Sequence, residues 1–192
     1  MTRIAIVDPQ PAIRAGLAML LRTEPGLVPV GAANGADDGI DLVARLRPQV
    51  VLLEQHLADG DGLSMCRRLK ALPESPRVIL YTTDHDGSLL LPARVAGADG
   101  LVDKAAAPQE LFEAIRVVAR GGSALPPLDP EHMDAAAHLI EPEDLALLAM
   151  LVDGTSTGDV ADTLRLDRRK VGRRIERLLG RLRARPTTTA AV

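Results

Sequence analysis

The sequence is poor in cysteine, in aromatic residues and in long apolar runs. Cys66 is the only cysteine, which excludes an internal disulfide and a cysteine-based metal site. Tyr81 and Phe112 are the only aromatic residues, so the core has to be aliphatic. No apolar run reaches transmembrane length, and the first residues lack the features of a signal peptide. We therefore expect a cytoplasmic protein without membrane contact, in which Cys66 is a buried apolar side chain.

Other signatures are missing as well. The four histidines, His56, His85, His132 and His138, are not spaced with carboxylates or Cys66 as metal ligands. The chain also lacks the glycine-rich loops that bind nucleotide phosphates. We therefore expect no metal, no cofactor and no enzymatic activity.

Basic residues are absent from residues 129–162, which contain nine acidic residues. Residues 165–185 reverse this pattern, with ten basic residues and two acidic ones. The formal net charge of -3 conceals this segregation. A local excess of positive charge is typical of a segment that binds nucleic acid.

The first 120 residues alternate short apolar runs with amphipathic stretches. The apolar runs predict strands at residues 3–8, 27–32, 50–54, 78–82 and 100–103. The stretches between them predict helices near residues 11–22, 36–46, 62–71, 88–96 and 108–120. Most of the runs are continuously apolar, which is typical of strands covered on both faces. We expect an α/β fold over residues 1–120, with a doubly wound, five-stranded parallel sheet.

Polar residues follow four of the predicted strands. Asp8, Glu54, Thr82 and Lys104 each lie at or just beyond the C-terminal end of a strand. The carboxyl ends of parallel strands meet at one edge of the sheet, where such folds bind their ligands. We therefore expect these four side chains to form a pocket.

A second, all-α domain follows a proline-rich stretch. We take residues 121–138 as a linker, residues 139–185 as the domain and residues 186–192 as a tail. The stripe of the first predicted helix consists of Leu145, Leu148, Met150 and Leu151. Gly154 ends this helix, and Ser156 and Asp167 can cap a second and a third. A short capped helix, a turn and a longer basic helix form a helix-turn-helix pattern.

The basic helix has an apolar side and a charged side. Its apolar stripe consists of Val171, Ile175, Leu178 and Leu182. Arg169, Arg173 and Glu176 lie opposite, where arginine can pair with guanine and glutamate with cytosine. The residues that flank this face, and that we expect near phosphates, are Lys170, Arg177 and Arg181. A solvated basic face is the main alternative, and a helix on a membrane surface is a lesser one.

Residues 140–182 resemble, without a gap, the helix-turn-helix of the NarL/LuxR-type two-component response regulators. The positions that match in kind include Pro142, Asp144, Leu145, Leu148, Leu151, Gly154, Ser156, Val160, Ala161, Leu164, Leu166, Val171 and Ile175. The base-reading positions of the family fall on Gly172, Arg173 and Glu176, and the family usually has Lys and His at Gly172 and Arg174. The resemblance implies sequence-specific binding of double-stranded DNA. The resulting DNA-binding candidates are Arg169, Lys170, Gly172, Arg173, Arg174, Glu176, Arg177 and Arg181. We also expect a homodimer, with half-sites about one helical turn apart.

Residues 1–120 resemble the receiver domains of the same family. The resemblance implies that Asp8 belongs to an acidic pair that binds Mg²⁺, and that Thr82 and Lys104 serve the phosphorylation site. Two positions depart from the family pattern. Pro9 stands where the second acid belongs, and Glu54 stands where the phosphoacceptor Asp belongs. The chain is therefore identified as an atypical, phosphorylation-site-degenerate response regulator.

These substitutions predict a pocket that is not phosphorylated. Mg²⁺ requires near-octahedral oxygen ligation, to which Pro9 contributes no carboxylate. Glu54 carries its carboxylate roughly 1.5 Å further out than Asp, into the space of a phosphoryl group. We expect Glu54 to pair with Lys104 and to hold the domain in one state. A salt bridge without a switching role is the alternative.

Other functions stay open at this point. The chain can be a phospho-switched regulator with an unusual acceptor, for which Asp59 and Asp61 are candidates of poor geometry. It can also be a receiver-fold adaptor whose C-terminal helices do not read DNA. If phosphorylation is not the input, another regulator or a small-molecule effector takes its place.

Overall fold

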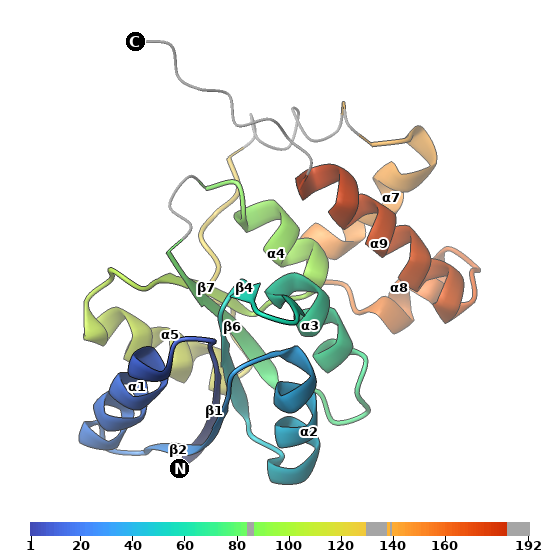
Figure 1. The fold of residues 1–192 in the computed structure, drawn as a ribbon. Coiled ribbons are helices and arrows are strands. Elements are labelled where there is room, and N and C mark those ends of the chain that lie inside the picture. Colours follow the sequence, from blue (N-terminus) through green and yellow to red (C-terminus); the bar gives the residue numbers. More distant parts are fainter. Residues whose placement is uncertain (84–86, 130–137, 139, 184–192) are drawn as a thin grey trace. The chain divides into compact units, whose positions relative to one another are not determined.

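The computed structural model describes residues 1–83, 87–129, 138 and 140–183. The chain divides into two compact units, Met1–Pro126 and Pro127–Val192 (Figure 1). Residues 130–137 of the predicted linker, the whole predicted tail, His85 and His132 lie outside the described residues. None of the helices in the described ranges is long and apolar enough to cross a bilayer.

The first unit is built on a five-stranded, fully parallel sheet, as the sequence predicts. Its strands are β1 (Thr2–Val7), β2 (Leu27–Ala33), β3 (Val50–Leu53), β6 (Arg77–Thr82) and β7 (Gly100–Asp103). They lie in the order β2-β1-β3-β6-β7. Because all five strands run the same way, their carboxyl ends share one edge of the sheet.

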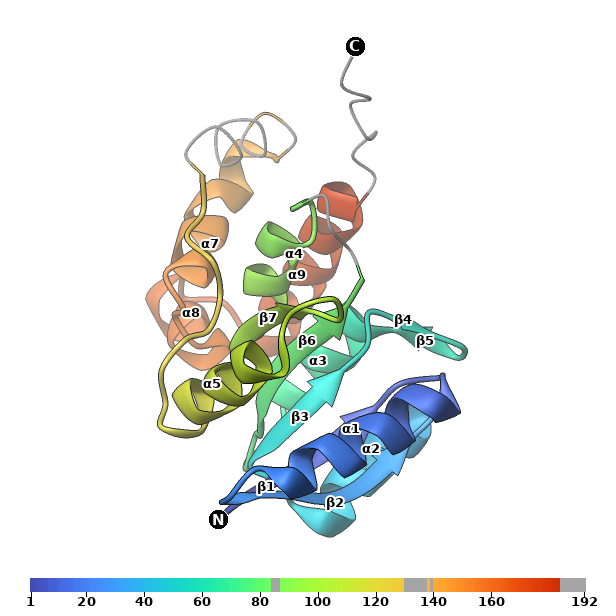
Figure 2. The ribbon, with the colours of Figure 1, turned by 90° about the vertical axis from the view of Figure 1, so that its left-hand side faces the viewer.

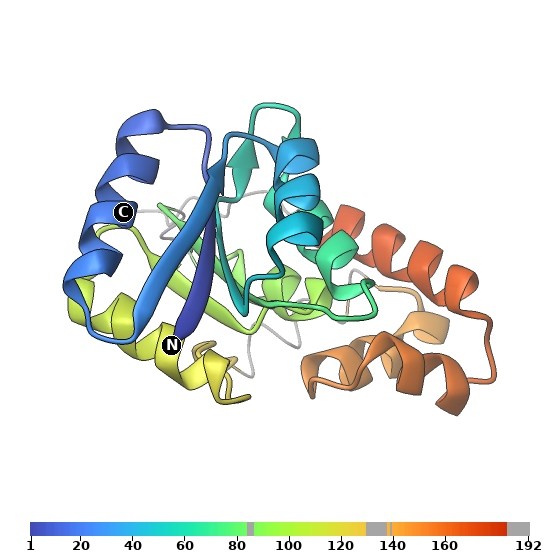
Figure 3. The same ribbon diagram turned by 90° about the horizontal axis from the view of Figure 1, so that it is seen from below.

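Helices cover both faces of this sheet. One face is covered by α1 (Pro11–Thr23) and α5 (Pro108–Ala119). The other is covered by α2 (Ala36–Leu46), α3 (Gly62–Lys70) and α4 (Leu90–Ala96), as Figures 2 and 3 show. Ile4 and Ile6 pack in the cluster with α1 and α5, whereas the side chain of Val7 lies close to Gly39 of α2. All four residues of β3 are buried, which explains why its sequence is continuously apolar.

A small hairpin that the sequence did not indicate follows β3. It consists of β4 (His56–Leu57) and β5 (Gly60–Asp61), which pair antiparallel. Strands of two residues are too short to produce a periodic pattern, so nothing in the sequence pointed to them. The hairpin holds its turn residue Asp59 against the N-terminus of α2.

The first unit also extends beyond residue 120, where the linker was predicted to begin. Gly121, at a φ of +89°, turns the chain back after α5. Ala124 then forms a parallel bridge with Gly100 at the outer edge of β7. Arg94 of α4 donates a 2.6 Å hydrogen bond to the carbonyl oxygen of Pro126. These contacts attach the first residues of the predicted linker to the sheet.

The second unit contains α7 (Pro142–Val152), α8 (Thr157–Thr163) and α9 (Arg168–Arg183). Both predicted caps are present. Ser156 Oγ accepts a hydrogen bond from the backbone N–H of Asp159, and Asp167 accepts one from that of Lys170. The apolar stripe of α9 is buried as predicted: Val171, Ile175, Leu178 and Leu182 are at most 7% exposed.

The predicted stripe of α7 was partly wrong. Leu145 is 39% exposed, and Met150 is only half-buried. The buried positions are Asp144, Leu147, Leu148 and Leu151, which follow the i, i+3, i+4, i+7 spacing of one helix face. The error arose because α7 is apolar almost all round, so the sequence did not distinguish its inner side.

Candidate functional site

The strand ends bring together the four polar side chains that the sequence singled out. Lys104 Nζ forms ion pairs with Glu54 Oε2 and, at 2.5 Å, with Asp8 Oδ2. Thr82 Oγ1 donates a hydrogen bond of 2.8 Å to Glu54 Oε1. All four side chains are buried, and that of Lys104 is only 8% exposed. We call this group of Asp8, Glu54, Thr82 and Lys104 the pocket latch.

Every acceptor of the Glu54 carboxylate is engaged. Oε1 also accepts the backbone N–H of His56 at 3.1 Å, while Oε2 binds Lys104. Burial raises the pKa of Glu54, but hydrogen bonds from Lys104, His56 and Thr82 outweigh it and hold this pKa below its ordinary value. Burial lowers the pKa of Lys104, and its bonds to Asp8 and Glu54 more than reverse that effect. Both partners are therefore charged at neutral pH.

The latch residues do not fit a Mg²⁺ ion. Asp8 Oδ1 accepts the backbone N–H of Gln10 at 2.7 Å, and Asp8 Oδ2 accepts from Lys104. Pro9 contributes no carboxylate, and the Lys104 ammonium group already bridges the two carboxylates present. Mg²⁺ needs several free oxygen ligands in octahedral geometry. Within the described ranges, no group of three His, Cys, Asp or Glu side chains is arranged to hold a metal.

The two alternative acceptors, Asp59 and Asp61, have structural contacts instead. Asp59 accepts the backbone N–H groups of Ala36, at 2.7 Å, and Asp37, at 3.2 Å. These bonds lower the pKa of Asp59. Asp61 accepts the backbone N–H of Ser64 at 3.1 Å. The two carboxylates thus cap α2 and α3.

Helix α9 presents most of the DNA-binding candidates to solvent. The exposed ones are Arg169, Lys170, Arg173, Glu176 and Arg177. Gly172 is half-buried and adds no side chain. A surface depression of about 560 Å³ lies along this part of α9, and Lys170, Arg173 and Arg177 are among the residues that line it.

Two of the candidates bind acceptors at the N-terminal end of α7, and one of them, Arg174, also lines the depression. Arg174 Nε forms an ion pair with Asp144, and Arg174 Nη2 donates to the carbonyl oxygen of Glu143. Arg181 Nη2 lies 2.9 Å from Glu141 Oε1. Asp144 was not predicted as a site residue, because α7 is apolar almost all round and its sequence does not show that this carboxylate faces inward.

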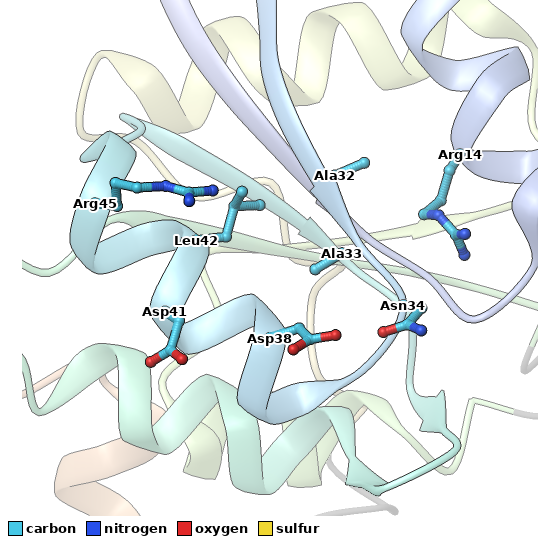
Figure 4. A pocket seen from close by; sticks show the side chains of 8 residues that line it. All are labelled: Arg14, Ala32, Ala33, Asn34, Asp38, Asp41, Leu42 and Arg45. Atoms are coloured by element: carbon cyan, nitrogen blue, oxygen red, sulfur yellow. The ribbon is translucent and has the colours of Figure 1, made fainter.

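Two further features lie apart from these sites. A depression of about 470 Å³ lies at the end of β2, between Arg14 of α1 and Arg45 of α2 (Figure 4). Its lining mixes acidic and basic side chains and includes none of the predicted site residues.

Cys66 is fully buried, as predicted, and burial raises the pKa of its thiol to about 12. The thiol is therefore unreactive.

The chain is similar to known response regulators. Residues 4–116 match the model of the response regulator receiver domain. The chain is 31% identical to the DNA-binding transcriptional activator DevR/DosR of Mycobacterium tuberculosis, over 100% of this chain and 93% of that protein. It is 29% identical to the nitrate/nitrite response regulator protein NarP of Escherichia coli, over 99% of this chain and 93% of that protein. Among solved structures, a LuxR-family two-component response regulator from Aurantimonas sp. SI85-9A1 is similar, with 28% identity and a TM-score of 0.62. That match covers 72% of this chain and 96% of the other.

Proposed function

This chain belongs to the NarL/LuxR-type response regulators, and from that premise we propose that it is a sequence-specific DNA-binding transcription regulator that acts without phosphorylation. The pocket latch is the observation that supports action without phosphorylation. Glu54 binds Lys104, Thr82 and the backbone N–H of His56 at the same time.

The latch leaves no room for phosphoryl transfer to Glu54. Such a transfer needs a metal ion to neutralise the phosphate oxygens and a nucleophile placed in line with the leaving group. Here the Glu54 carboxylate is ion-paired with Lys104 and hydrogen-bonded on its other oxygen. Pro9 stands at the position of a metal ligand. Both requirements are therefore unmet.

The same contacts hold the receiver-like unit in one state. A phosphoryl group on a shorter acceptor would need the ammonium of Lys104 and the hydroxyl of Thr82 as its partners. The longer side chain of Glu54 brings a carboxylate to both of these groups instead. The unit is thus permanently arranged as if an anion were bound, and its input is a partner protein or a small molecule.

The DNA-binding half of the proposal is supported by α9 and by the relatives. Arg173 and Glu176 lie on its exposed side, opposite the buried stripe, where they can reach base edges. Lys170 and Arg177 lie to one side of them and are placed to meet phosphates. DevR/DosR, which matches the whole chain, is a DNA-binding transcriptional activator. We propose that this chain binds double-stranded DNA as a homodimer.

The phosphorylation half is tested by incubating the protein with acetyl phosphate and Mg²⁺ and measuring its intact mass. We expect no gain in mass. The double variant Pro9→Asp with Glu54→Asp restores the acidic set and serves as the matched control, which should gain one phosphoryl group. A phosphorylated wild-type protein would refute this half of the proposal.

The DNA half is tested by selection from a random-sequence library of double-stranded DNA. We expect enrichment of a two-fold site and an affinity that falls steeply with salt. A protein that enriches no sequence would refute this half.

A further inference from the structure

Two of the arginines predicted to contact DNA, Arg174 and Arg181, bind acceptors at the N-terminal end of α7. The Arg174 side chain is 13% exposed, and the Asp144 carboxylate that it binds is 3% exposed. Arg174 also donates to the carbonyl oxygen of Glu143, so its guanidinium spans two acceptors of the first turn of α7. Glu141, the residue that precedes α7, binds Arg181 in a pair that is more open to solvent.

The two pairs lie on one side of α9. Arg174 and Arg181 are seven residues apart, which is about two helical turns, so they project from nearly the same side. This side lies between the buried stripe and the exposed Arg173. The pairs therefore oppose rotation of α9 about its own axis, in addition to the buried apolar stripe.

We propose that Arg174 and Arg181 are positioning residues, which set the rotation of α9 and thereby choose the side chains that meet DNA. This inference rests on the proposed DNA-binding function. It confines the DNA-facing set to the five exposed residues Arg169, Lys170, Arg173, Glu176 and Arg177. Neighbouring residues in a helix are separated by about 100°. A modest rotation of α9 would therefore move Arg173 off the base edges.

The Asp144–Arg174 pair matters more for the position of α9 than the Glu141–Arg181 pair does. The Asp144 carboxylate is buried and the Arg174 side chain is partly buried, so removal of the arginine leaves an uncompensated buried charge. Such a single variant can fail to fold. Replacement of both partners by apolar groups of similar volume is tolerated far better. The double variant Asp144→Leu with Arg174→Met therefore keeps the fold and the net charge while it removes the directional bond.

The experiment compares this double variant with the wild type and with Arg177→Ala in the full-length protein. Each is subjected to selection from the random-sequence duplex library, and its affinity for the duplex enriched by the wild type is measured over a range of NaCl concentrations. We expect the double variant to lose roughly 10-fold or more of its preference for that duplex, because a misplaced arginine loses a bidentate base contact. Its salt slope should stay at the wild-type value, since Arg174 neutralises no phosphate. Arg177→Ala should lower the slope by about 0.9 while it keeps the preference.

Arg174→Lys supplies the conservative comparison, because it retains the charge beside Asp144. Arg174→Lys should keep most of the wild-type base preference, whereas the double variant should lose it. A double variant whose salt slope falls by about one, with its preference intact, would show that Arg174 contacts a phosphate and would overturn the inference. Unchanged preference and unchanged slope would overturn it as well. If the wild type itself enriches no sequence, the proposed function falls, and the inference falls with it.

Discussion

Replacement of Lys104 by Met is the perturbation that most directly probes the pocket latch. It leaves Asp8, 2% exposed, and Glu54, 6% exposed, as two carboxylates without their shared counter-ion. Loss of one partner of a buried ion pair costs about 3–5 kcal/mol. We therefore expect the first unit to lose about this much free energy of unfolding at pH 7.

The loss should depend on pH in a defined direction. In the wild type the folded protein lowers the pKa of Glu54. The stability that Glu54 contributes is therefore fully present above its ordinary pKa of 4.5 and is lost as the pH falls through its pKa in the folded state. The pKa of Lys104 is raised, so its contribution is present below 10.5 and is lost as the pH rises through the folded value. Without Lys104, burial and the neighbouring Asp8 raise the pKa of Glu54. The penalty should therefore shrink between pH 7 and pH 5, as one carboxylate takes up a proton.

Hydrogen exchange at the amides of β1 and β3, combined with denaturant titration, reports on this unit alone. Lys70→Met is the matched control. Lys70 lies 2.6 Å from Asp99, which keeps Arg77 as a second partner, at 2.8 Å, when Lys70 is lost. The control should cost only about 1 kcal/mol. A Lys104→Met variant that costs no more than this control at pH 7 would show that Lys104 stabilises the first unit no more than Lys70 does.

Two further outcomes are expected. Asp59→Ala removes the cap of α2 and should cost about 1 kcal/mol of unfolding free energy, measured by denaturant titration; no loss would show that the hairpin contact contributes nothing. Arg173→Ala should relax base preference in the library selection, whereas Lys170→Ala should weaken binding to all duplexes alike and lower the salt slope by about one. If neither α9 variant changes binding, the DNA-facing side of α9 is assigned wrongly.

The sheet could be predicted from the sequence because buried parallel strands leave a distinct pattern. Strand β3 is apolar throughout, since helices cover both of its faces, and its end places Glu54 at the edge of the sheet. The resemblance to receiver domains then indicated the pairing of Glu54 with Lys104, which the structure contains. The second bond of Lys104, to Asp8, was not anticipated. It depends on how near the ends of β1 and β7 come to each other in three dimensions.

The sequence could not predict which way the side chains on the flank of α9 turn. A helical wheel gives the angle of each residue relative to the apolar stripe, but Arg174 and Arg181 have long side chains that can turn to either side. Their direction is decided by Asp144 and Glu141, which lie 30 and 40 residues away along the chain. Periodicity is read in windows of roughly 11–18 residues, so it does not reveal such contacts. The bridge at Ala124 was missed for a similar reason, because it depends on a tertiary contact with Gly100. The hairpin at Asp59 is local, but its strands of two residues are too short to produce a periodic pattern.

We propose that this chain binds its DNA sites in a state fixed by Glu54 rather than by a phosphoryl group. The most direct test is the affinity of the purified protein for its selected duplex, measured with and without acetyl phosphate and Mg²⁺. We predict tight, selective binding that is the same in both conditions. Selective binding that appears or strengthens only when the phosphate donor is present would contradict the proposal that Glu54 fixes the DNA-binding state.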